Sequence, residues 1–328
     1  MPPHCFTTIG RSLLALCSAL TLSACAVLPG SLQPGMWFRS SSEVMHVRLL
    51  DIAYPLLTAA AEWCPFDQEP TYGLLLRDQP DDHAVDRPVL VAYVHPRLPA
   101  AAAGIAVGDV ILEVNTAPVS GQPAVQVGRL IDRLTKAKIQ PLQLEFMRDR
   151  ARRTVALSAI PACHYVMQVL DTAIINGMSD GRRIGVTRGA LQFFASDDEV
   201  GWVVAHEIAH NILHHTQNMK FQAMLQRFRS AWGDMIDAPD AIPSRPSLEV
   251  QADSVGAYLM ARAGYDLDAV RRAWAQLQHL EARPGGQKPT LSQTHPPTQE
   301  RLAAFARTLR EIEAKRKTAQ PLEPGRGE

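Results

Sequence analysis

The HEIAH motif of residues 206–210 constrains this 328-residue chain more than any other stretch. It follows three acidic residues at 197–199, and acidic residues behind a capping Ser196 are typical of a helix N-terminus. We expect a helix from there to about His215. A spacing of four residues places His206 and His210 on one helix face, where both can bind one metal ion. Glu207 lies beside them and can act as general base toward a water on the metal.

A candidate third metal ligand lies in a second acidic segment, Glu249-Val250-Gln251-Ala252-Asp253. In a helix Glu249 and Asp253 share a face, and a carboxylate from a second helix is the third ligand of many zinc sites. Asp253 can then accept a hydrogen bond from a ligand histidine. For Glu249 alone, a solvated acidic face is the alternative. The histidine helix favours one zinc ion per chain held by His206, His210 and Glu249.

The stretches around the site resemble the HtpX-like and CaaX-prenyl-protease-like zinc metallopeptidases, which carry the gluzincin type of HExxH site. The resemblance rests on residues 184–191, on HEIAH and on EVQAD, and it covers roughly residues 164–310. It implies a peptidase that uses zinc. It also implies that a strand at residues 183–186 forms the rim of the site, where an edge strand can hold an extended peptide by strand addition.

Relatives of this kind carry a His-Pro element with a downstream arginine, matched here by His295, Pro296 and Arg301. The resemblance implies that Arg301 stabilises an oxyanion or holds the substrate backbone. His295 lies among prolines, which indicates a loop, and neutral imidazole could fill the open zinc position and close the enzyme at rest. Capping and packing of the last helix is the alternative for both residues. We interpret His214 and His215 as structural or surface groups, because on a continuous helix they are rotated away from the metal.

Residues 99–115 resemble the core of bacterial PDZ domains, with a short small-residue helix, a Gly-Asp turn and a strand that ends in Asn115. Upstream, Tyr72, Gly73 and Leu74 resemble the loop whose backbone N–H groups receive a peptide carboxylate. A purely structural or regulatory PDZ domain is the alternative. Strands are expected at residues 89–94, 109–114, 142–147 and 154–157, with a helix around 127–134.

The PDZ segment interrupts the peptidase core, whose first helix is expected at residues 44–63. Cys64 and Cys163 stand at the two ends of this insertion. Cys5 and Cys17 fall in the predicted signal peptide and Cys25 takes a lipid, so an even pair remains. An even remainder in an exported protein predicts a Cys64–Cys163 disulfide.

The N-terminus predicts export. Arg11 precedes an apolar run over residues 12–24, which has the length of a signal-peptide core. The run ends in Leu22-Ser23-Ala24-Cys25, which resembles the bacterial lipobox, so Cys25 is the expected lipidation site. An ordinary secretory signal with an incidental cysteine is the alternative. By resemblance to the sorting rule of enteric bacteria, Ala26 and Val27 favour the periplasmic side of the outer membrane, with inner-membrane anchoring or periplasmic secretion as alternatives.

The fold class expected from these features is α+β, with a mainly helical zincin-type core, a small edge sheet and an inserted β-rich PDZ domain. The expected layout is a signal peptide at 1–24, a tether at 25–43, a first helix at 44–65, a PDZ domain at 66–160, a peptidase core at 161–312 and a disordered tail at 313–328. Formal net charge is zero, and no basic stripe indicates a nucleic-acid partner.

Together these features predict a zinc endopeptidase of the bacterial envelope that acts on protein or peptide substrates, with peptide C-termini as partners of the PDZ domain. The resemblance and the lipid anchor imply a quality-control role. One alternative is a lipid-anchored PDZ adaptor or chaperone with a vestigial metal site. Another is a zinc amidohydrolase that acts on cell-wall peptides.

Overall fold

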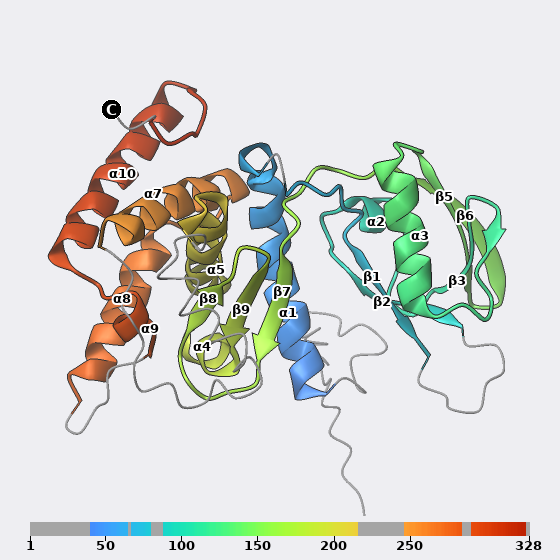
Figure 1. Ribbon diagram of the computed structural model, residues 1–328, viewed down its shortest axis with the longest axis horizontal. Helices are drawn as coiled ribbons and strands as arrows, with labels where there is room; N and C mark the ends of the chain where they lie inside the picture. Colours follow the sequence, from blue (N-terminus) through green and yellow to red (C-terminus); the bar gives the residue numbers. More distant parts are fainter. Residues whose placement is uncertain (1–39, 65–66, 80–87, 216–245, 284–289, 326–328) are drawn as a thin grey trace, which may run out of the picture. The chain divides into compact units, whose positions relative to one another are not determined.

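A computed structural model describes residues 40–64, 67–79, 88–215, 246–283 and 290–325. It confirms the α+β class: along the chain, a β-rich domain follows the first helix and precedes a mainly helical core (Figure 1). The predicted signal peptide, Cys25 and most of the predicted tether lie outside the described residues. Within the described ranges, no helix is both long and apolar enough to cross a membrane.

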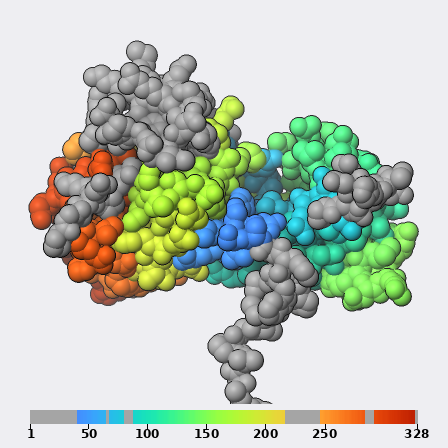
Figure 2. Space-filling model, turned by 90° about the horizontal axis from the view of Figure 1, so that it is seen from below, coloured from blue at the N-terminus to red at the C-terminus, as the bar shows by residue number. Residues whose placement is uncertain are grey.

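The first helix, α1 (Ser41–Ala59), begins at a capping box formed by Ser40 and Glu43, and a short 3-10 turn η2 (Ala61–Trp63) follows it. Its inward face buries Leu49, Ile52 and Leu56 completely or almost completely. That face packs against the small sheet and the zinc-motif helix of the core, and the blue surface of α1 adjoins the yellow-green segment in Figure 2. The expected first helix of the core is therefore present.

The inserted domain is an antiparallel sheet covered by helices. Its elements are β1 (Leu74–Asp78), β2 (Val89–Val94), α2 (Pro99–Ala102), β3 (Val110–Val114), β4 (Ala117–Pro118), α3 (Ala124–Lys136), β5 (Leu142–Arg148) and β6 (Ala151–Leu157). The strand order is β1-β2-β3-β5-β6, and β4 pairs with β3. Alternating residues of β2 and β5 are buried, because one face of each strand packs in the core of this domain.

The core continues with a small sheet and then with helices. These are β7 (Val166–Leu170), β8 (Gly177–Ser179), β9 (Arg183–Thr187), α4 (Arg188–Phe193), α5 (Asp197–Ile212), α7 (Pro246–Ala263), α8 (Asp268–Glu281), α9 (Thr290–Thr294) and α10 (Gln299–Lys317). Helices α5 and α7 pack closely along each other, and β8 and β9 lie against α5. The sheet therefore borders the motif helix (Figure 1).

The expected strand at residues 183–186 exists as β9, but its expected position at the edge is wrong. It lies in the middle of the small sheet, parallel to β7 on one side and antiparallel to β8 on the other. Strand β8 is the edge next to α5. The sequence missed β7 and β8 because both are short, and five or fewer residues carry too little alternation to separate a strand from a helical pattern.

The expected disordered tail from residue 313 is also wrong in part, since α10 continues to Lys317. Two ion pairs at a spacing of four residues run along this last part, Glu311 with Lys315 and Glu313 with Lys317, each at 2.7 Å. Pairs at this spacing lie on one helix face and stabilise a polar helix. A polar composition therefore did not imply disorder at this position.

Candidate metal centre

Helix α5 holds the two motif histidines because its start is fixed by local hydrogen bonds. Ser196 accepts from the Glu199 backbone N–H, and the Glu199 carboxylate accepts from the Ser196 backbone N–H, which together form a capping box. The helix is buried over most of its length, and His206 and His210 are 3% and 4% exposed. It ends at Ile212, one turn before the expected end.

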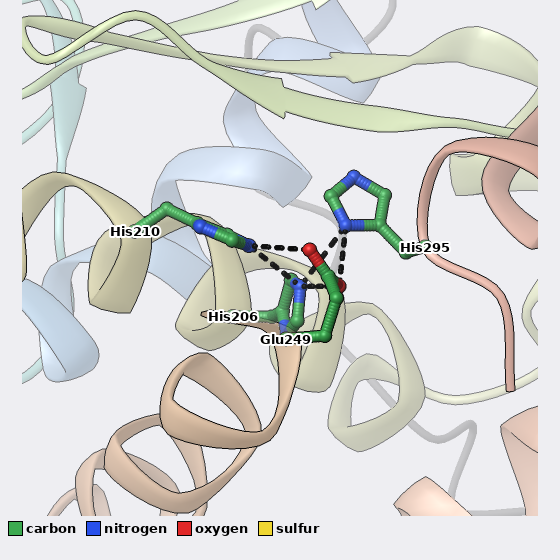
Figure 3. Close-up of side chains that lie close together, drawn as sticks. All are labelled: His206, His210, Glu249 and His295. Carbon is green, nitrogen blue, oxygen red and sulfur yellow. Dashed lines mark hydrogen bonds and ion pairs between the residues drawn. The ribbon is translucent and has the colours of Figure 1, made fainter. Parts of the chain in front are cut away.

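Helix α7 reaches the histidines because a glycine lets the two helices approach. A Cβ atom on Gly256 would lie 3.3 Å from the backbone N of His206. One to two turns earlier on α7, Glu249 Oε2 lies 3.1 Å from His206 Nε2 and Oε1 lies 3.4 Å from His210 Nε2. The two Nε2 atoms are 3.0 Å apart, so all three side chains point at one small volume (Figure 3).

The His295 side chain points at the same volume. This residue follows α9 in a loop that contains prolines, as expected. Its Nδ1 lies 2.9 Å from Glu249 Oε2 and 3.2 Å from His206 Nε2. One ligand atom from each of His206, His210, Glu249 and His295 falls within 4.8 Å of the others. Two imidazoles and a carboxylate, with a third imidazole beside them, are the donor set that zinc prefers, so these residues fit a zinc ion.

A buried ion pair between Asp253 and Arg301 contacts the ligand His206 on the side of its ring that faces away from the metal position. Asp253 Oδ1 lies 3.1 Å from His206 Nδ1, as expected for a partner that orients a ligand. Arg301 is 1% exposed and donates to both Asp253 oxygens, at 2.7 and 2.8 Å, and to the backbone carbonyls of His295 and Pro296. Its donors are thus committed to the support of the site, which corrects the expected role of Arg301 at the oxyanion.

Glu207 is held by a residue that sequence reasoning missed. The Ser179 hydroxyl, at the end of edge strand β8, donates to Glu207 Oε2 at 2.8 Å. Strand β8 can approach because a Cβ on Gly177 would lie 2.5 Å from Val203 Cγ1 of α5. The Gly181 backbone N–H also donates to Asn211 Oδ1 at 2.7 Å, so the β8–β9 turn is attached to the same helix. No local sequence pattern predicts the role of Ser179, because its contact with Glu207 joins two segments that are distant in the sequence.

The charges of the metal-free site are strongly coupled. Burial disfavours the charged form of His206, but hydrogen bonds to Asp253 and Glu249 outweigh burial and raise the pKa of His206 to about 10. Burial also opposes ionisation of Glu249, yet His295, His206 and His210 hold the pKa of Glu249 far below its usual value. The pKa of His210 is lowered, first by burial and also by the charge on His206. Glu249 is therefore ionised, and His206 carries a proton that must leave before its Nε2 can bind a metal.

The residues predicted outside the metal centre also have clear positions. Cys64 and Cys163 form a disulfide with their Cα atoms 5.8 Å apart, at the two ends of the insertion. Tyr72 is buried, and its hydroxyl lies 2.9 Å from the Thr135 hydroxyl of α3. Gly73 has a φ of +74°, and its N–H donates to Thr71 Oγ1 at 3.1 Å. This N–H is thus occupied by the loop itself.

The HExxH helix, the carboxylate from a second helix and the edge strand beside them define the metallopeptidase class of site. Residues 141–238 and 239–309, together more than half of the chain, match the model of Peptidase family M48, and residues 67–146 match the PDZ domain model. The chain belongs to peptidase family M48 and carries a PDZ domain. This confirms the family expected from the motifs.

Curated relatives match the chain over part of their length. Mitochondrial metalloendopeptidase OMA1 of Arabidopsis thaliana is 28% identical over 153 residues, which are 40% of this chain and 32% of that protein. OMA1 of Schizosaccharomyces pombe is 24% identical over 197 residues, which are 48% of this chain and 56% of that protein. Among solved structures, the HtrA3 PDZ domain bound to a phage-derived ligand (FGRWV) is similar at 22% identity, with a TM-score of 0.24, over 29% of this chain and 88% of that chain.

These relatives overturn one prediction. The expected location on the periplasmic side of the outer membrane is wrong, because both curated relatives are named as mitochondrial proteins. The prediction rested on residues 11–27 alone, and a short N-terminal segment carries much less family information than the peptidase region that the relatives match. The expected quality-control role in a bacterial envelope depended on that location, so it is no longer supported.

Proposed function

We propose that this chain is a zinc-dependent endopeptidase that binds one zinc ion through His206, His210 and Glu249. The observation that carries the proposal is the convergence of the two Nε2 atoms and the Glu249 carboxylate, all buried, beside an independently held Glu207. When bound, zinc would supply Lewis-acid activation of a water and of the substrate carbonyl. Membership of a peptidase family supports peptide bonds as the substrate class.

Residues of the chain then have separate roles in proton transfer, in the orientation of a ligand and in substrate binding. Glu207 takes a proton from the attacking water and later returns it to the leaving amine, while Ser179 holds its carboxylate in place. Asp253 and Arg301 orient His206. The edge of β8 that pairs with no other described strand can hold an extended substrate by strand addition, a role expected for residues 183–186 but better suited to the strand at the edge.

Metal removal and product mapping test this function. Purified protein is expected to cut unfolded casein at internal bonds, to lose that activity in a chelator and to regain it with zinc, as followed by mass spectrometry of the products. Zinc-loaded protein that leaves casein intact but releases fragments from peptidoglycan would support an amidohydrolase instead. Zinc binding without hydrolysis of either substrate would support an adaptor.

Zinc binding is expected to release about one proton per chain at pH 8. The pKa of His206 is raised to about 10 in the metal-free protein, so the proton on His206 must leave when the metal arrives. Affinity should therefore rise about tenfold per pH unit below that pKa and level off above it. His210 contributes no proton, because its pKa is lowered from 6.5.

Calorimetry in two buffers with different ionisation enthalpies measures the proton release. In Asp253→Asn the pKa of His206 should fall, because a partner that raises it is gone, and the release at pH 8 should shrink. Zinc binding without proton release at pH 8 in the unaltered protein would contradict this charge assignment.

We also propose that His295 occupies the fourth zinc position at rest. Its Nδ1 lies within 3.2 Å of His206 Nε2, and Arg301 holds its backbone carbonyl at 2.7 Å. A water must take that position for catalysis, so the loop must move away before substrate is cut. The PDZ domain or the substrate would then shift the balance between the closed and open states.

His295→Ala is expected to raise basal casein hydrolysis by about tenfold or more, as for a resting state with about 10% or fewer open molecules. The exposed His279 of α8 offers a matched control, since His279→Ala should leave the rate unchanged. Rates are measured at saturating zinc. A lower rate in His295→Ala would assign the residue to transition-state stabilisation and remove the closed resting state.

For the PDZ domain we propose that peptide C-termini bind beside β1. This strand is at the edge of the sheet, and α3 lies next to it. Leu75 is 37% exposed on it, which leaves apolar surface for a peptide side chain. The Gly73 N–H must exchange its bond to Thr71 for the carboxylate, and this requirement favours weak, regulated binding.

A further inference from the structure

The two histidines of the motif are supported in different ways at the ring nitrogen that faces away from the metal position. His206 Nδ1 contacts the carboxylate of Asp253 at 3.1 Å. His210 Nδ1 contacts a third imidazole instead, with 3.0 Å to His215 Nδ1. The ring centroids of His210 and His215 are 5.0 Å apart and the ring planes make an angle of 69°, so the two rings are not stacked.

His215 is placed there by a break in the helix. Helix α5 ends at Ile212, and His214 adopts a φ of +54°, which no helical residue has. On a continuous helix, a residue five positions after His210 would be rotated by about 140° from it. The break returns the His215 side chain to His210 and leaves it 8% exposed. The expectation that His215 is a surface or merely structural group assumed the continuous helix.

A second contact points to the nitrogen of His215 that carries the proton. His215 Nε2 lies 3.2 Å from Gln251 Oε1 on α7. An amide oxygen only accepts, so Nε2 must donate, and Nδ1 of the neutral ring is then an acceptor. His210 Nδ1 must in turn donate to it, which leaves the lone pair of His210 Nε2 free for the metal position. The chain of three groups thus selects the His210 tautomer that can bind zinc.

We infer that His215 is a positioning residue for the ligand His210 and that Gln251 sets the tautomer of His215; this inference rests on the proposed zinc site. Carboxylates and backbone carbonyls are the usual acceptors behind a ligand histidine. A neutral imidazole, His215, replaces them here. Helix α7 thereby supports both ligand histidines, through Asp253 and through Gln251.

Competition titration of the metal-free full-length chain with zinc tests the inference without an activity assay. His215→Phe keeps the ring volume but removes the acceptor, and it is expected to weaken zinc binding by about 10–100-fold. His215→Asn, whose amide oxygen can take the place of Nδ1, should recover most of that loss. His279→Asn, at an exposed histidine of α8, is the control, and its zinc affinity should be unchanged.

Gln251→Leu should weaken binding less than His215→Phe, because Gln251 is exposed and water can replace its amide. The double variant should be no weaker than His215→Phe alone, since both changes interrupt one chain of hydrogen bonds. Equal zinc affinity of His215→Phe and the unaltered protein would overturn the inference. An unaltered protein that binds no zinc would instead overturn the proposed function.

Nitrogen-15 spectroscopy of the zinc-loaded, unaltered protein gives a readout that needs no variant to fold. His215 is expected as the neutral tautomer with the proton on Nε2, and His210 with the proton on Nδ1. The opposite tautomer of His215 would overturn the inference even where His215→Phe fails to fold.

Discussion

Glu207→Gln is expected to lower peptide hydrolysis by about 10²–10⁴-fold while zinc stays bound. The side chain is 1% exposed, and the hydroxyl of Ser179 donates to one of its oxygens at 2.8 Å. Glutamine has the same shape and can still accept that hydrogen bond, but it cannot take a proton from water. Turnover of unfolded casein and zinc content per chain, measured on the same preparation, separate the two effects.

Glu300→Gln is the matched control for this change. Glu300 is exposed in the first turn of α10, away from the ligands, so the same loss of charge should leave the rate unaltered. Loss of zinc from a normally folded Glu207→Gln protein would assign Glu207 to the metal and not to the base. An unchanged rate would transfer proton removal to another group.

The sequence located the ligands because local rules determine where they lie. A capping residue, an acidic first turn and a spacing of four fix α5 and the common face of His206 and His210. Short apolar segments bounded by turns located most strands of the PDZ domain, and the Gly-Asp turn before Val110 carried the resemblance to its family. These features depend on residues within a few positions of each other, so they can be interpreted without the fold.

Contacts between distant segments could not be predicted in the same way. Ser179 and Glu207 are 28 positions apart in the sequence and still form a hydrogen bond. The three residues of β8 are too few to predict a strand or its position at the edge of the sheet. His215 was interpreted as a structural or surface group because helical geometry was extended through a residue with positive φ, whereas its side chain is buried against His210. Arg301 was assigned to the oxyanion, although Asp253 already engages its guanidinium in the interior. In each case the partner, and not the residue type, determines the role.

Arg301→Leu is expected to destabilise the metal-free protein by about 3–5 kcal/mol, the usual cost of removing one partner of a buried ion pair. Both side chains of the Arg301–Asp253 pair are 1% exposed, so water cannot solvate the carboxylate that remains. The carbonyls of His295 and Pro296 also lose their donor, so the loop that carries His295 loses an anchor. Urea unfolding in the presence of a chelator measures the change without a contribution from zinc binding.

Two further variants separate the buried pair from a general effect of losing an arginine. Arg307→Leu removes an exposed arginine from the same helix and should change stability by about 0.5 kcal/mol or less. Asp253→Asn combined with Arg301→Leu should cost less than the sum of the single changes, because the charge left unpaired in Arg301→Leu is absent. If Arg301→Leu were no less stable than Arg307→Leu, the pair would contribute orientation of His206 only. In that case its removal would appear as weaker zinc binding and not as a lower unfolding midpoint, since Arg301 would no longer hold the Asp253 carboxylate against His206.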